Sequence, residues 1–113
     1  MGDHINIRSA PGTWVVRAGG AVIGESSNAL ELTEGAHDPV IYFPRDDIAM
    51  ALLEPSDHAS HCPWKGDAHY FSVITKSTTL QNAAWSYETP LEASSRIAGY
   101  LAFYGDKVTV EKL

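Results

Sequence analysis

Turn-forming residues recur about every ten positions along this chain and limit it to short structural elements. The runs between these turns are rich in Val, Ile, Thr and aromatic residues, which is typical of antiparallel β domains. The clearest signal joins residues 13–18 to residues 21–24 through Gly19-Gly20. A two-residue type I′ turn requires a positive φ at both positions, which glycine adopts without steric cost. The sequence therefore predicts a hairpin here, in a mainly β protein without long helices.

Local patterns predict the remaining elements. Pro44 has no N–H for a sheet ladder, so it ends a strand and opens one helical turn over residues 44–47. A brief helix is expected within residues 90–100, capped by Thr89. Residues 56–65 are polar and are predicted to form an ordered loop. Further strands are predicted at residues 28–33, 40–43, 68–75 and 80–87, the last two pairing as a hairpin, with a second short hairpin over residues 101–111.

Length and charge exclude several classes of protein. A chain of 113 residues predicts one domain over residues 1–113, with an ordered core from about 13 to 110. Eight basic against fourteen acidic residues give a net charge of −6, which disfavours a nucleic-acid partner. No window approaches the roughly 18 apolar residues of a spanning helix, so no membrane partner is expected. The single Cys62 excludes an internal disulfide and a zinc site of paired cysteines, and it favours a cytoplasmic location.

Five local motifs together carry a family resemblance. They are IYFPRDDI (41–48), LLEPSD (52–57), HCPWKGDAHYFSV (61–73), AWSYETP (84–90) and IAGYLAFYGDKV (97–108). With them the chain resembles the bacterial family catalogued as domain of unknown function 427, which carries a nucleotidyltransferase-like label. The resemblance implies a β-tent fold of two small antiparallel sheets with one or two short helical turns. Relatives of that fold bind a structural zinc through paired cysteines, and the single cysteine implies that this zinc is absent here.

The segment around Cys62 offers one candidate reaction centre. A thiol becomes a nucleophile when a nearby cation lowers its pKa, and Lys65 lies three positions away. In an enzyme, Lys65 would stabilise an anion, Asp67 or His69 would act as acid or base, and Cys62 would be a nucleophile. The alternative is structural, with Cys62 as a small buried hydrophobe and Trp64 packed on the core.

Two candidate metal sites are weaker, and no metal or cofactor is expected. His58, His61 and His69 provide three imidazoles, but their spacing outside a helix does not place the rings together. Asp46 and Asp47 are adjacent, and adjacent carboxylates on an extended chain point to opposite sides. Nucleotidyl transfer needs carboxylates that converge on two metal ions together with donors for a triphosphate, and neither is visible in the sequence.

Aromatic and charged residues in the family-like motifs suggest a ligand pocket. Trp85 and Tyr87 share one face of a predicted strand, where their rings would be neighbours. Core packing is the competing explanation for any single ring. A pocket combines an apolar lining with a few convergent polar groups. The candidate ligand-binding residues are Tyr42, Arg45, Asp46, Trp64, Trp85, Tyr87 and Glu88.

These residues are compatible with two classes of function, and the family label adds a further alternative. One is a domain that binds a small molecule of unknown identity, and whether it is also an enzyme stays undecided. Its pocket would be aromatic and basic, formed by residues 42–47, 62–69 and 85–88. The other is a non-catalytic interaction or scaffold module, with self-association through an exposed sheet edge as one form. A concave pocket containing Lys65 and Arg45 would favour the first class, and mutually satisfied buried pairs would favour the second. A nucleotidyltransferase is the further alternative implied by the family label.

Overall fold

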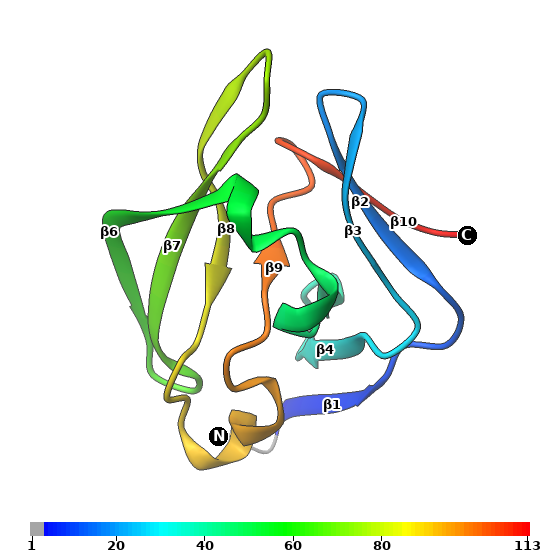
Figure 1. The fold of residues 1–113 in the computed structure, drawn as a ribbon. Coiled ribbons are helices and arrows are strands. Elements are labelled where there is room, and N and C mark those ends of the chain that lie inside the picture. The colour runs from blue at the N-terminus through cyan, green and yellow to red at the C-terminus, as the bar shows by residue number, and fades with distance from the viewer. Residues whose placement is uncertain (1–3) are drawn as a thin grey trace.

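The strands of the protein form three small sheets set at angles to one another (Figure 1). The structure is a computed structural model that describes residues 4–113. Within these residues every strand pairing is antiparallel. The mainly β prediction is confirmed, with three sheets in place of the expected two. The strands are β1 (Ile5–Ser9), β2 (Trp14–Ala18), β3 (Ala21–Ser26), β4 (Leu30–Glu34), β5 (Val40–Tyr42), β6 (Leu53–Cys62), β7 (Gly66–Ile74), β8 (Thr79–Ser86), β9 (Ala102–Phe103) and β10 (Thr109–Lys112).

The edges of the three sheets meet near the middle of the molecule. The strand orders are β1-β4-β5, β10-β2-β3 and β6-β7-β8-β9, so β5, β10 and β9 are each outermost in their sheet. A bridge between Phe43 and Leu101 ties the end of β5 to the start of β9. Figure 1 shows β9 between the β6-β7-β8 side and the β2-β3-β10 side. This convergence creates a junction to which all three sheets contribute side chains.

The hairpin predicted at Gly19-Gly20 is confirmed. Gly19 and Gly20 connect β2 to β3 with φ values of 55° and 84°. Farther along β3, Gly24 bridges to Ile48, and a Cβ added at Gly24 would collide with the Ile48 side chain. Glycine therefore acts twice in this hairpin, once through its backbone freedom and once through its small size.

The predicted loop over residues 56–65 is wrong, because most of this segment belongs to the ten-residue strand β6. Most β6 side chains are exposed, so the alternation of apolar and polar residues that marks a half-buried strand is missing. The strand lies at the edge of its sheet, where Pro55 costs no ladder bond to a neighbour on the outer side. Its pairing with β7 is irregular between Pro55 and Ala59.

The predicted C-terminal hairpin over residues 101–111 is also wrong. β9 pairs with β8, whereas β10 pairs with β2 in a different sheet, with Lys112 opposite Trp14. The local turn at Gly105 gave no information about this long-range pairing. β1 pairs with β4 and was not predicted from the sequence.

The helical turns are short and are all 3-10 helices. η2 (Arg45–Asp47) follows Pro44 as predicted, although Pro44 is the capping residue before the turn. η4 (Glu92–Ile97) is capped at Leu91, so the predicted cap at Thr89 is wrong. A further turn, η3 (Met50–Leu52), leads into β6. Of residues 4–113, no helix is long and apolar enough to cross a bilayer.

The apolar residues of the described chain pack into two clusters. The larger one joins β2 and β3 to β7, β8 and the chain around β9, with Val16, Phe43, Val73 and Leu101 completely enclosed. The smaller one lies between β4 and β5 on one side and β7 and the end of β8 on the other. Its buried members are Leu30, Leu32, Tyr42, Ala68, Tyr70, Tyr87, Ile97 and Ala102.

Candidate functional site

Three of the predicted ligand-binding aromatics come together, in the smaller core cluster. Tyr42 and Tyr87 are buried, and Trp85 packs against them half-buried. The Trp85 indole donates a hydrogen bond to Tyr42 Oη over 3.3 Å, and the two rings meet edge to face. Burial raises the pKa of both Tyr42 and Tyr87 above the ordinary value, so both are neutral hydroxyls. Tyr42 and Tyr87 are only 1% and 6% exposed, so their rings pack as core residues between two sheets.

Arg45 is held by three hydrogen-bond partners. Its guanidinium donates to the Gly99 carbonyl at 3.0 Å, to Ser86 Oγ at 3.3 Å and to Glu88 Oε2 at 2.7 Å. The charged group also lies 5.6 Å from the centroid of the Phe71 ring. Arg45 therefore ties η2 to the end of β8 and to the segment after η4, and its predicted neighbour Glu88 serves as its partner.

Lys65 is likewise paired, with a partner that sequence reasoning did not identify. Its Nζ donates to Glu34 Oε1 over 2.6 Å, and the two side chains are only 13% and 18% exposed. The hydrogen bond and charge of Lys65 hold the pKa of Glu34 below its ordinary value, and His4 adds a weaker contact to the same carboxylate. Lys65 Nζ also lies 5.9 Å from the Tyr87 ring centroid. This pair joins β4 to the loop between β6 and β7.

The proposed thiol and its acid–base partners lie on opposite faces of a sheet. Cys62 ends β6 and packs half-buried against the smaller core cluster, on the face that Ala68 also occupies. Asp67 and His69 alternate with Ala68 along β7 and point to solvent. Asp67 pairs there with His61, whose Nδ1 lies 2.7 Å from Asp67 Oδ1. The structure therefore does not bring Cys62 together with these candidates.

The remaining predicted residues are dispersed. Trp64 packs edge to face on the His4 ring, 5.2 Å between centroids. Asp46 borders a shallow hollow beside Arg45 and Gly99. In residues 4–113 no group of three or more His, Cys, Asp or Glu side chains is placed to hold a metal ion.

A groove of about 690 Å³ opens at the junction of the three sheets. We call it the three-sheet groove. Trp14 and Trp85 line it, and of these two only Trp85 was predicted to bind a ligand. Trp64, the other tryptophan predicted to do so, does not line it. Its walls are mostly apolar and aromatic. β4 and β5 contribute Glu31, Val40 and Ile41, β2 and β10 contribute Trp14 and Val110, and the β8–β9 side contributes Trp85, Phe103 and Tyr104.

Tyr104 connects the groove to a chain of hydroxyls. Its ring packs on Trp85 with centroids 4.5 Å apart, and its Oη lies 3.2 Å from Tyr70 Oη. Tyr70 Oη lies in turn 3.0 Å from Ser60 Oγ on β6. Burial and the hydrogen bond with Tyr70 raise the pKa of Tyr104 to about 12, so it faces the groove as a neutral hydroxyl.

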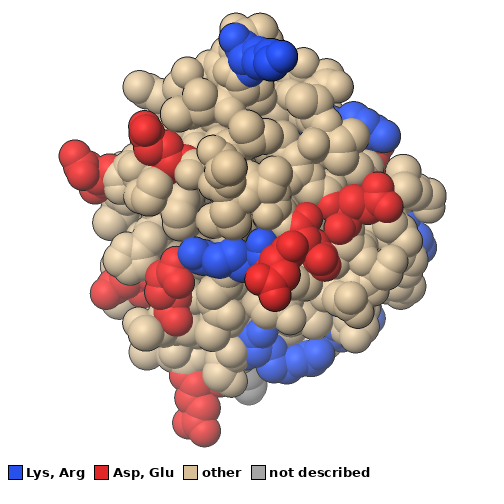
Figure 2. Space-filling view, in the orientation of Figure 1, with Lys and Arg blue, Asp and Glu red and all other residues tan. Residues whose placement is uncertain are grey.

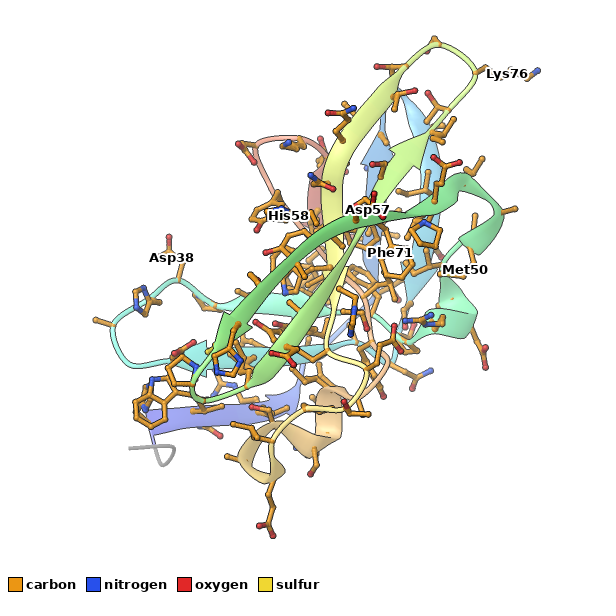
Figure 3. The ribbon with its side chains drawn as sticks, turned by 90° about the vertical axis from the view of Figure 1, so that its left-hand side faces the viewer. Asp38, Met50, Asp57, His58, Phe71 and Lys76 are labelled. Carbon is orange, nitrogen blue, oxygen red and sulfur yellow. The ribbon has the colours of Figure 1, made fainter. Side chains whose placement is uncertain are left out.

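The rim of the groove is acidic. Glu31 on β4 and Asp38 in the connection from β4 to β5 both border it. Figure 3 shows Asp38 on an outlying loop, with its side chain pointing away from the ribbon. Among the described residues that line the groove there is no Lys, Arg or His.

Sequence reasoning missed most of this groove. Trp14, Tyr104 and Asp38 line the groove but are not among the ligand-binding residues predicted from the sequence. The sequence does not show that Trp14 and Tyr104 line one groove, because this depends on the long-range pairing of β2 with β10 and of β8 with β9.

Comparison with known families identifies the family of this chain. The model of the family described as domain of unknown function (DUF427) matches residues 6–112, which is nearly the whole chain. No curated protein matches the sequence significantly.

Proposed function

The chain belongs to the DUF427 family, and from its geometry we propose that it is a small-molecule-binding domain whose ligand occupies the three-sheet groove. The observation that carries this proposal is the exposure of two tryptophans, Trp14 and Trp85, in one concave, mostly apolar groove. Ligand sites in proteins are concave and apolar with a few polar groups, and the volume of about 690 Å³ lies in the range of such sites.

The proposed site differs from the aromatic and basic pocket expected from the sequence. Lys65 and Arg45 are each bound by carboxylates of the chain itself, Glu34 and Glu88. We assign these two pairs to the scaffold, which is the outcome expected at these residues for an interaction module, and the ligand proposal rests on the separate three-sheet groove. Trp85 belongs to both arrangements, since its N–H contacts the filled cluster at Tyr42 and its ring lines the groove.

Binding is favoured over nucleotidyl transfer by the residues present. Nucleotidyl transfer requires carboxylates that converge on metal ions and basic groups that hold the triphosphate. In residues 4–113 no such cluster of metal ligands is formed, and the groove lining that the structure describes is without basic side chains. A nucleophile paired with a base is also missing from that lining.

The expected absence of a nucleic-acid partner forms part of the same proposal. On the face shown in Figure 2, the basic side chains are spread over separate places and do not gather into one patch. Phosphate binding rests on such a patch. A cytoplasmic location, inferred from the single cysteine, and self-association through the outer edge of β6 complete the proposal.

A fragment screen tests the proposed function. Small aromatic and heteroaromatic compounds, neutral and charged, are titrated into the ¹⁵N-labelled protein, and the indole N–H signals of the three tryptophans are followed by NMR. We expect binders to shift the signals of Trp14 and Trp85 while that of Trp64 stays unchanged. Trp14→Leu should weaken such binding, and Trp64→Leu is the matched control. Compounds that shift only Trp64, or no binder at all, would contradict the proposal.

A further inference from the structure

The tryptophans of the three-sheet groove have no N–H to offer a ligand. Trp14 Nε1 donates to the Pro11 carbonyl over 3.1 Å, and Trp85 Nε1 donates to Tyr42 Oη over 3.3 Å. What both residues present to the groove is ring surface. The faces of indole rings carry negative electrostatic potential, and they attract cations within about 6 Å of the ring centre.

The charges around the groove have the same sign. Glu31 and Asp38 are the ionisable side chains of acidic type in its lining, and no basic side chain accompanies them among the described lining residues. Asp38 is exposed and has no hydrogen-bond or ion-pair partner within residues 4–113 (Figure 3). Glu31 is bonded by Arg8, whose Nε lies 2.8 Å from Glu31 Oε1, but Arg8 itself is 66% exposed and stands outside the groove.

We propose that the ligand of the three-sheet groove is a small organic cation, an ammonium or guanidinium group carried on an apolar body. This inference rests on the proposed function and adds the chemical class of the ligand. The apolar body packs against Ile41, Phe103 and Val110, and the cation lies over the indole faces on the side of the acidic rim.

The same features disfavour the other classes of ligand. An anion would meet two carboxylates at the rim and no compensating charge in the described lining. A neutral polar molecule would need donors and acceptors, and the two indole N–H groups are already engaged. Tyr104 is the one hydroxyl-bearing side chain of the described lining, and its Oη is already bonded to Tyr70 Oη.

Choline and 3,3-dimethylbutan-1-ol separate charge from shape in the test. The two molecules have the same shape, and the alcohol has a carbon in place of the charged nitrogen. Both are titrated at low salt against the Trp14 and Trp85 indole signals. Two ring faces and a carboxylate rim should make the choline dissociation constant about tenfold lower than that of the alcohol.

Charge variants of exposed residues extend the test without risk to the fold. Asp38→Asn should weaken choline binding about two- to threefold and leave the alcohol unchanged. Asp57→Asn, an exposed carboxylate on β6 outside the groove, changes the net charge equally and should leave choline binding unchanged. Arg8→Gln frees the Glu31 carboxylate and should strengthen choline binding about twofold.

The outcomes separate this inference from the proposed function. Equal affinities for choline and the alcohol, or the same effect from Asp38→Asn and Asp57→Asn, would overturn the cation assignment. If neutral or anionic fragments bind at Trp14 and Trp85 while choline does not, the groove is a ligand site of another class. If no probe of any charge shifts these two signals, both proposals fail.

Discussion

The Lys65–Glu34 pair decides whether the motif that contains Lys65 has a structural role or binds a ligand. We consider the substitution Lys65→Met, which keeps the apolar stem against Tyr87 and removes the charge. Glu34 then loses the donor at 2.6 Å and keeps only His4, whose Nε2 lies 3.4 Å from Oε2. We expect the folded protein to lose stability, because a mostly enclosed carboxylate loses its main partner.

The size of the loss follows from exposure. Hydrogen bonds to charged groups contribute about 1.5–3 kcal/mol, and breaking a fully buried ion pair costs about 3–5 kcal/mol. The Lys65 and Glu34 side chains are 13% and 18% exposed, so solvent screens part of the interaction. We therefore expect Lys65→Met to cost about 2 kcal/mol. With an unfolding entropy of about 2.1 cal/mol/K per residue, this lowers Tm by about 8 °C for a chain of 113 residues.

A double-mutant cycle measures the pairwise part of this effect. Lys65→Met, Glu34→Gln and the double variant are compared by urea denaturation at neutral pH. The double variant should be more stable than the sum of the single losses predicts, by about 1 kcal/mol, because the second substitution removes a carboxylate that the first left unpaired. Purely additive losses would show that the two side chains do not stabilise each other.

The same pair should give a pH dependence of known sign. Lys65 lowers the pKa of Glu34 in the folded protein below its ordinary value of 4.5. A carboxyl group with a lowered folded pKa contributes stability above its unfolded pKa and loses that contribution as the pH falls through its folded pKa. The stability difference between wild type and Lys65→Met should therefore be full at neutral pH and shrink below about pH 4.5.

One result would refute the structural assignment of Lys65. If Lys65→Met left Tm within about 2 °C of wild type while abolishing ligand binding, Lys65 would be a functional cation and the groove would not be the site.

Four further substitutions have expected outcomes. Arg45→Lys should lower the free energy of unfolding by about 1 kcal/mol in urea denaturation, because lysine cannot reach three acceptors at once. Glu88→Gln should change it by less than about 0.5 kcal/mol, because the Arg45–Glu88 pair is partly solvated. An equal loss in both variants would contradict this expectation. Gly24→Ala should cost about 2 kcal/mol because the added methyl group meets Ile48, and an unchanged Tm would show that Ile48 moves freely. Tyr104→Phe should remove a phenolate absorbance step near pH 12. Because the raised pKa favours the neutral hydroxyl, Tyr104 contributes stability below about pH 10 that should be lost between pH 10 and 12. An absorbance step that persists unchanged in the variant would refute this.

Local chemistry was enough to predict part of the fold. The β2–β3 hairpin followed from two glycines that need no information from the rest of the chain. β6 was missed because most side chains of this edge strand are exposed, so its sequence does not alternate between apolar and polar residues. The partners of β9 and β10 were missed because they are chosen by sheets formed elsewhere in the sequence.

The candidate site was likewise predicted only in part from the sequence. Tyr42 and Arg45, from one motif, contact Trp85 and Ser86 from another. Their interpretation as a basic pocket depended on empty space around Lys65 and Arg45. The carboxylates that occupy that space come from β4 and from the segment after β8, and only one of them, Glu88, lies in the motifs that drew attention.

The pairing of β10 with β2 has a consequence for the order in which the protein acquires its site. Lys112 lies opposite Trp14, so the β10-β2-β3 sheet closes a loop that spans most of the chain. Contacts so distant in sequence carry a large entropic cost and form late in folding. Trp14 and Val110 meet in the groove only after this step, so a nascent chain still lacking β10 presents an incomplete groove. Ligand affinity should therefore mark the completion of folding, and a ligand added during refolding should stabilise only the last state to form.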